Sequence, residues 1–150
     1  GWHSDTSITV AVGTSTSSIN NFLTIGKRAV KKAIEVCIAG NRVWDLSHAM
    51  QTTVENAGYG VVTALTGHGI GRYLHEEPAV PCFEVQDYKH SPLLRVGMVL
   101  AIEIMYAQGS GEVVYKNDDG WTICTRDGKI AGLFEETVAI TKDGPLILTK

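Results

Sequence analysis

Several features that would place this chain in a familiar class are scarce or missing. Its three cysteines, Cys37, Cys82 and Cys124, are far apart and form no CxxC pair. That usage argues against a disulfide framework and for free thiols in a reducing compartment, so we expect a cytoplasmic protein. The longest apolar run, Met98 to Ile102, is far shorter than the roughly 20 residues that span a bilayer. We therefore expect no membrane partner.

An excess of positive charge is missing as well. The 150 residues contain 13 Lys and Arg against 16 Asp and Glu, a formal net charge of −3. This balance gives no reason to expect nucleic acid as a partner. The 44% hydrophobic and 19% charged content is ordinary for a globular domain. We expect one domain over residues 1–150, and a partial one, because the opening GWHSDTSITVAV resembles the middle of a domain whose N-terminal part is cut or absent.

The sequence predicts helices first and strands later. Residues Thr6 to Val12 are rich in β-branched side chains and predict a strand. Apolar residues at helical spacing from Ile19 to Ile38 predict a long helix ended by Gly40, and Asp45 is a candidate cap for a second helix ended by Gly58. Further strands are predicted at 59–65, 98–106, 121–125, 135–141 and 146–149. This order indicates an α+β fold, an antiparallel sheet with helices on one face.

Glu103 is a carboxylate within the apolar strand from Met98 to Met105. Burial of such a group is unfavourable unless it is paired or binds a metal, although an exposed strand face would look similar. His68 lies between two glycines, which either allow a close approach to a ligand or simply form a tight loop. Asp5 and Glu135 are candidates of the same kind, and each taken alone is also consistent with a solvated position.

Taken together, Asp5, His68, Glu103 and Glu135 form an oxygen-rich ligand set with one imidazole. Such a set suits Mn, Fe, Co or Zn in the +2 state. Carboxylates that bridge two such ions, about 3.5–4 Å apart, are typical of hydrolytic sites. His75 would then lie near the metal or the substrate and donate a hydrogen bond to a developing oxyanion.

The order and spacing of several segments resemble type I methionine aminopeptidases along the whole chain. These segments are HSDTS at 3–7, GHGIGR at 67–72, HEEP at 75–78, GM at 97–98, IE at 102–103, DGWT at 119–122 and FEET at 134–137. The resemblance implies the pita-bread metallopeptidase fold. It also implies that Asp5 and Glu135 bridge two divalent ions (Co, Mn, Fe or Zn), and that His68 and Glu103 bind one of them.

The resemblance further assigns catalytic roles to His75, which contacts the scissile peptide, and to Glu103, which shuttles the proton of the attacking water. His75, Leu74 and Trp121 are the implied substrate-binding residues, with Trp121 at the mouth of the methionine pocket. Family members carry a fifth metal ligand, an Asp, on a strand preceding the segment where this chain begins. One ion therefore keeps four protein ligands and the other only two, so it should bind weakly or not at all. Smaller departures affect the pocket and its surroundings: Ser4, Leu74, Ile104, Leu133 and Glu136 stand where Gly, Phe, Pro, Gln and His are usual.

The resemblance implies a hydrolase, a metalloprotease that removes the N-terminal methionine from nascent proteins through a metal-activated water. The short segment between Glu103 and Glu135 favours type I over type II. Two alternatives stay open: an Xaa-Pro aminopeptidase or prolidase, and a non-catalytic binding module. The expected partners are a peptide or nascent protein with N-terminal Met and the absent N-terminal segment as a separate chain. Without that segment, we expect exposed strand edges to drive self-association.

Overall fold

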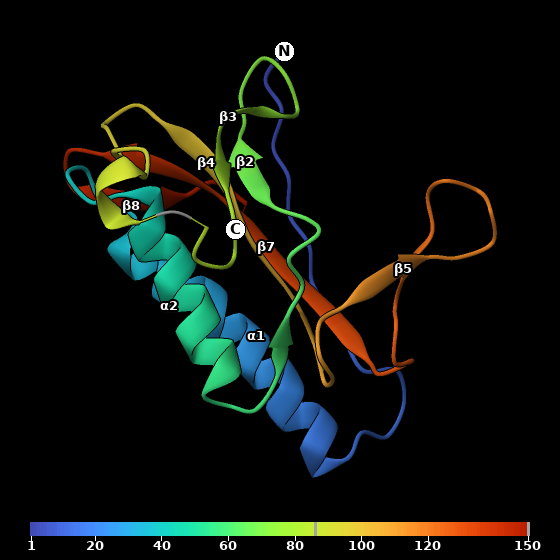
Figure 1. Cartoon of the computed structure of the whole chain (residues 1–150). Coiled ribbons are helices and arrows are strands. Elements are labelled where there is room, and N and C mark those ends of the chain that lie inside the picture. Colours follow the sequence, from blue (N-terminus) through green and yellow to red (C-terminus); the bar gives the residue numbers. More distant parts are fainter. Residues whose placement is uncertain (86, 150) are drawn as a thin grey trace.

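The computed structural model describes residues 1–85 and 87–149, which form a twisted antiparallel sheet with two helices packed along one face (Figure 1). The strand order is β3-β2-β4-β7-β8, with β1 paired to β4. The strands are β1 (Gly60–Val61), β2 (Gly67–Gly69), β3 (Glu76–Val80), β4 (Val99–Ala107), β7 (Ala131–Thr141) and β8 (Gly144–Ile147). A separate hairpin consists of β5 (Val113–Tyr115) and β6 (Ile123–Thr125). The predicted α+β class, with helices on one face, is confirmed.

The first helix, α1 (Ser17–Val36), begins where the sequence offers a cap. The Thr16 side chain accepts a hydrogen bond from the Ile19 backbone N–H at 3.3 Å, which satisfies one of the free donors at the helix start. The buried face of α1 includes Phe22, Ile25 and Ala29, which recur at helical spacing. This helix agrees closely with its prediction.

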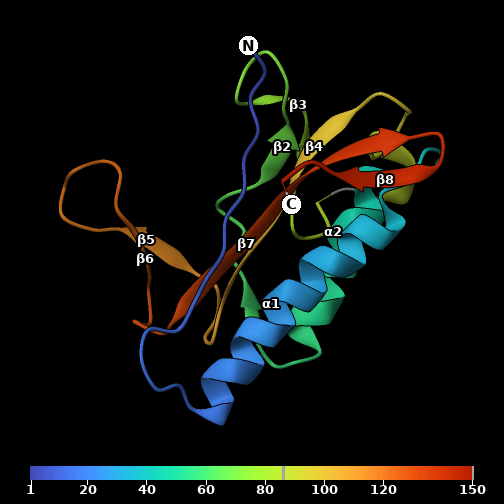
Figure 2. The same cartoon turned by 180° about the vertical axis from the view of Figure 1, so that it is seen from behind.

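The second helix, α2 (Val43–Glu55), is capped by Asp45 from inside its first turn. The Asp45 carboxylate accepts the Arg42 backbone N–H at 2.7 Å, so Arg42 occupies the cap position. Figure 2 shows both helices side by side on one side of β7 and the extended N-terminal segment on its other side. Neither helix, within the residues that the structure describes, is long and apolar enough to cross a bilayer.

The core lies between these helices and the two long central strands, β4 and β7. The Tyr106 ring stacks on Phe22 at 4.3 Å between centroids, and its hydroxyl donates to the Phe22 backbone oxygen at 2.6 Å. A Cβ atom at Gly26 would lie 2.4 Å from the Tyr106 hydroxyl oxygen, so α1 approaches the sheet as closely as a glycine allows. This packing fixes β4 and β7, which carry two of the predicted site residues.

The predicted strand from Thr6 to Val12 is wrong as a regular strand. The segment is extended beside β7, but only Ser7 forms a backbone bridge, to Glu135. Side-chain hydroxyls replace the remaining ladder bonds: Thr9 Oγ1 donates to the Leu133 oxygen at 2.7 Å and accepts from the Leu133 N–H at 2.8 Å. Thr137 does the same with the backbone of Asp5. The β-branched composition correctly predicted an extended segment, but side-chain hydroxyls make most of its hydrogen bonds to β7.

Other strand predictions differ at their boundaries. The prediction at 59–65 shrinks to Gly60–Val61, and β6 begins at Ile123 rather than Trp121. Strands β2, β3 and β5 were not predicted, because they are short and because β2 and β3 contain the glycine and proline residues that usually mark turns. All three cysteines are free, as expected.

Candidate metal centre

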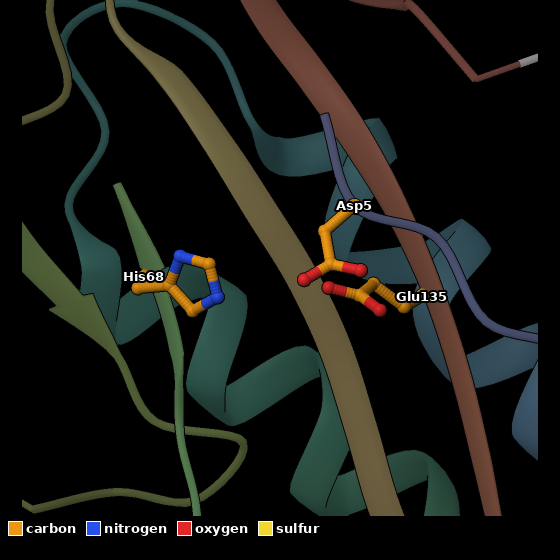
Figure 3. Close-up of side chains that lie close together, drawn as sticks. All are labelled: Asp5, His68 and Glu135. Carbon is orange, nitrogen blue, oxygen red and sulfur yellow. The ribbon is translucent and has the colours of Figure 1, made fainter. Parts of the chain in front are cut away.

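Three of the four predicted metal ligands converge on one point of the sheet face opposite the helices. Asp5 comes from the extended N-terminal segment, His68 from β2 and Glu135 from β7. Each offers one ligand atom, and these atoms all lie within 4.8 Å of one another. Figure 3 shows the two carboxylates facing each other and the imidazole turned toward them. An ion of ordinary metal–ligand distance can therefore be reached by all three.

Each of these three residues is held in place by hydrogen bonds of its own, through the backbone for Asp5 and through the side chain for Glu135 and His68. The Asp5 backbone is held by Thr137 Oγ1, which accepts from the Asp5 N–H at 2.9 Å and donates to the Asp5 oxygen at 2.7 Å. The Ser7 hydroxyl donates to Glu135 Oε2 at 3.0 Å. His68 Nδ1 lies 2.9 Å from the Gly69 backbone oxygen. Nδ1 must carry a proton to make this bond, which leaves Nε2 free to bind a metal.

Close packing of the backbone explains why glycine stands on either side of His68. A Cβ at Gly67 would lie 2.5 Å from the Ala101 oxygen on β4, and one at Gly69 would lie 2.3 Å from the Glu77 oxygen. Only residues without a side chain let β2 fit between its two neighbours at this distance. The glycine pattern therefore marks a tightly packed central strand, and not the tight loop that was one interpretation of the sequence.

Glu103 lies next to this cluster on β4. It is paired in register with Glu135 on β7, and its Oε1 atom lies 3.9 Å from His68 Nε2. Burial raises the pKa of Glu103 to about 8, and the carboxylates of Glu135 and Asp5 add to the rise. Burial and, to a smaller extent, the nearby Asp5 carboxylate also raise the pKa of Glu135. Three crowded carboxylates and one imidazole form an unfavourable arrangement that a divalent cation would relieve, so the donor set suits such an ion.

His75 lies beside the cluster, in the loop between β2 and β3. Its ring meets the His68 ring edge-on, with 4.4 Å between centroids and 74° between planes. Leu74, in the same loop, is 40% exposed. Trp121 is placed elsewhere: it is 85% exposed in the loop between β5 and β6, a hairpin that projects from the main sheet in both views (Figures 1 and 2).

An apolar cavity of about 370 Å³ lies on the same face as the carboxylates. Its walls include Met105 and Leu133, which are paired in register two residues along β4 and β7 from Glu103 and Glu135. Because side chains alternate along a strand, all four point to one face. Met105 was not among the predicted site residues, and Leu133 stood out only as a departure from the family. The alternation is visible in the sequence, but the register that brings the pair together is not.

The model of metallopeptidase family M24 matches residues 1–142. The chain belongs to metallopeptidase family M24. This membership accounts for the ligand cluster, since the members of a metallopeptidase family work with bound metal ions.

The chain is similar to methionine aminopeptidases and, at lower identity, to prolidases. The methionine aminopeptidase of Aquifex aeolicus is 43% identical over 150 residues, which cover 100% of this chain and 58% of the relative. A solved methionine aminopeptidase from Thermotoga maritima matches with a TM-score of 0.93 and 39% identity, over 99% of this chain and 59% of that one. A prolidase from Pyrococcus furiosus matches with a TM-score of 0.74 and 25% identity, over 99% of this chain and 37% of that one. The predicted pita-bread fold is confirmed, and the chain spans a little over half the length of its curated relatives.

Proposed function

We propose that this chain is the metal-binding part of a methionine aminopeptidase, a metal-dependent hydrolase that removes the N-terminal methionine of nascent proteins in the cytoplasm. Residues 1–150 would form a single, partial catalytic domain. The observation that carries the proposal is the convergence of Asp5, His68 and Glu135 beside Glu103. The similarity to methionine aminopeptidases over the whole chain supports the choice of substrate.

The residues that would hold the metal are Asp5, His68, Glu103 and Glu135. Their three carboxylates and one imidazole suit Co, Mn, Fe or Zn in the +2 state, one or two ions per site. Such an ion lowers the pKa of water and polarises a carbonyl group. His68 presents Nε2 to the site because its Nδ1 is held by the Gly69 oxygen.

Glu103 is the group that we assign to proton transfer. Its side chain is largely buried, beside His68 and opposite Glu135, so it can hold a proton and return it without competition from bulk solvent. His75 would donate a hydrogen bond to the carbonyl oxygen of the scissile peptide as negative charge develops there. Its place edge-on to His68 puts an imidazole within reach of a substrate bound at the cluster.

The methionine side chain would enter the apolar cavity beside the carboxylates. Met105 and Leu133 lie roughly 7 Å along the strands from Glu103 and Glu135, at about 3.4 Å per residue. That separation suits a substrate whose scissile carbonyl lies at the cluster and whose unbranched side chain extends over the pair. Leu74 and Trp121, the other proposed substrate-binding residues, belong to an exposed loop and an exposed hairpin, which would close over the substrate.

A proposed partner, besides the substrate, is a further β-strand along the N-terminal segment. Ile8, Val10 and Val12 are 75%, 64% and 96% exposed, and they alternate with the residues that contact β7. An extended edge with an apolar stripe is a template for strand addition. The strand would come from the N-terminal part of the family domain, supplied as a separate chain.

The test is release of methionine from a Met-Ala-Ser peptide in the presence of Mn²⁺ or Co²⁺, beside an Xaa-Pro peptide at the same concentration. We expect metal-dependent release of methionine, by the chain alone or after addition of a segment that corresponds to the N-terminal part of the relatives. Faster cleavage of the Xaa-Pro peptide would assign the chain to the prolidases. A chain that binds metal weakly and cleaves neither peptide with the added segment would be a binding module.

A further inference from the structure

The loop of residues 71–75, which carries His75, has few contacts to hold it in place. One is at its second residue, where the Arg72 guanidinium lies over the Trp2 ring, 5.0 Å from the ring centroid. Residues 72–75 are all exposed. Two backbone hydrogen bonds involve its first residue: the Gly71 N–H donates to the Tyr73 oxygen at 3.1 Å, and the Gly71 oxygen accepts from the His3 N–H at 2.8 Å. Neither bond reaches His75. The edge-on contact of His75 with His68 therefore needs another restraint, since exposed loops are otherwise mobile.

The carboxylate of Glu76 supplies such a restraint. Glu76 is the first residue of β3, and its Oε1 atom accepts the Tyr73 backbone N–H at 2.8 Å. Both carboxylate oxygens also lie against Gly71, where an added Cβ would be 3.0 Å from each. The side chain thus folds back over the loop and contacts its beginning and its middle. A hydrogen bond from an N–H to a charged acceptor is about twice as strong as a neutral one.

The two neighbouring glutamates differ in their surroundings. Glu76 is half-buried and bound to the loop backbone, whereas Glu77 is exposed. Gly71 and Glu76 also lie close together, because a Cβ at position 71 would force the carboxylate to shift by a few tenths of an ångström. Glu77, its neighbour, has no such contact with the loop backbone among the hydrogen bonds of the described residues.

We propose that Glu76 is a positioning residue: its carboxylate fixes the loop of residues 71–75 so that the His75 ring meets His68 edge-on and faces the substrate. This inference rests on the proposed function, in which His75 hydrogen-bonds the scissile carbonyl. Glu76 itself touches neither the metal ligands nor the substrate. Its loss should therefore leave metal binding intact and weaken the interaction that His75 makes in the transition state.

The geometry is tested by NMR, independently of activity. In the wild-type chain, the ring protons of His68 and His75 should give a nuclear Overhauser effect, since the ring centroids are 4.4 Å apart. We expect Glu76→Ala to abolish it and Glu76→Gln, which keeps an acceptor oxygen, to retain it. Gly71→Ala, which keeps Glu76 but shifts its carboxylate by a few tenths of an ångström, should weaken it without abolishing it. Glu77→Ala is the matched control and should change nothing.

The kinetic consequence is tested in the protein that releases methionine, with the added N-terminal segment if it is needed. We expect Glu76→Ala to lower kcat about tenfold or more, as small misplacements of catalytic groups do, with KM and Mn²⁺ affinity essentially unchanged. Glu76→Gln should restore most of the rate. The inference is overturned if Glu76→Ala keeps the His68–His75 effect, or if it weakens Mn²⁺ binding as much as it lowers kcat. A wild-type protein that shows the effect but releases no methionine would refute the proposed function and leave the positioning role in place.

Discussion

At the scale of single residues, the site is defined by carboxylates that repel one another. Glu103 and Glu135 are directly opposite on neighbouring strands, a position where like charges are unfavourable. Asp5 adds a third carboxylate to the same point. A cation bound at this point would stabilise the arrangement, because the carboxylates that repel one another in the metal-free protein would each be attracted to its positive charge.

The metal-free protein should therefore lose stability as pH rises. The pKa of Glu103 is about 8 in the folded chain against 4.5 for an ordinary glutamate, so between these values the folded state binds a proton that the unfolded state lacks. Its favourable contribution is fully present below pH 4.5 and is lost as pH approaches 8. We expect a decrease on the order of 3 kcal/mol between pH 5.5 and pH 8. Urea unfolding with chelator at pH 5.5 and pH 8 measures it.

The matched variants are Glu103→Gln and Glu77→Gln. Glu103→Gln removes the buried titrating group, so it should stabilise the metal-free protein at pH 8 and flatten the dependence on pH. Glu77 is exposed, and its substitution should leave the wild-type profile unchanged. An equal loss of stability with rising pH in wild type and Glu103→Gln would show that Glu103 is not the group responsible.

Resemblance identified the residues of the site better than local pattern did. Asp5, His68 and Glu135 converge although each, taken alone, was also consistent with a solvated position. Met105 was missed as a wall of the cavity because its neighbour Leu133 is remote in the sequence. Two residues become neighbours through strand register, which follows from long-range packing and not from composition.

At the scale of elements, the N-terminal segment shows how hydroxyl side chains replace a strand. Thr9 makes two hydrogen bonds to the Leu133 backbone, and Thr137 makes two to the Asp5 backbone. The sequence predicted an extended segment there but not the irregular pairing. Propensity scales score Thr for its β-branched shape, whereas here its hydroxyl decides the local structure.

Thr9→Val tests the role of these hydroxyls in holding Asp5 at the site. Valine keeps the shape of the side chain but leaves the N–H and oxygen of Leu133 without that partner. We expect a loss of about 1–3 kcal/mol in the local stability of the segment, seen as faster hydrogen exchange of the Leu133 amide. Thr14→Val, in an exposed turn, is the control. Unchanged exchange at Leu133 in Thr9→Val would mean that the segment is held by other contacts.

Long elements were predictable and short ones were not. Helix α1 and strand β4 carry strong apolar patterns, and their predictions came close to the observed bounds, whereas β7 begins at Ala131, four residues before the predicted start at 135. Strand β2 has three residues, two of them glycine, so its sequence resembles a turn. It is a strand because it fits between β3 and β4, where only glycine can approach so closely. Packing from both sides decided its structure.

At the scale of the whole molecule, an exposed apolar edge is the feature that most favours self-association. Ile8, Val10 and Val12 present an alternating stripe along the N-terminal segment. We expect the chain to self-associate with increasing concentration, measured by light scattering, and to do so less when a suitable partner strand is added. Val10→Lys should reduce the association, because a charged residue on an edge opposes strand pairing.

Val85→Lys is the matched control, since Val85 is also exposed, at 58%, but lies in a loop outside the N-terminal segment. If both lysine variants reduce association equally, general charge and not the edge is responsible. A wild-type chain that stays a monodisperse monomer at all concentrations would contradict the expectation.

The most direct test of the account is calorimetric titration of the metal-free chain with Mn²⁺ at neutral pH, repeated with His68→Ala and with His90→Ala. His68 belongs to the cluster, whereas His90 is exposed at the end of a short 3-10 helix (Tyr88–His90) and pairs with Asp87. We expect one ion bound per chain, an affinity at least about tenfold weaker in His68→Ala, since one of the ligands is lost, and no change in His90→Ala. Absence of binding by wild type, or equal binding by His68→Ala, would contradict a metal centre built from Asp5, His68, Glu103 and Glu135.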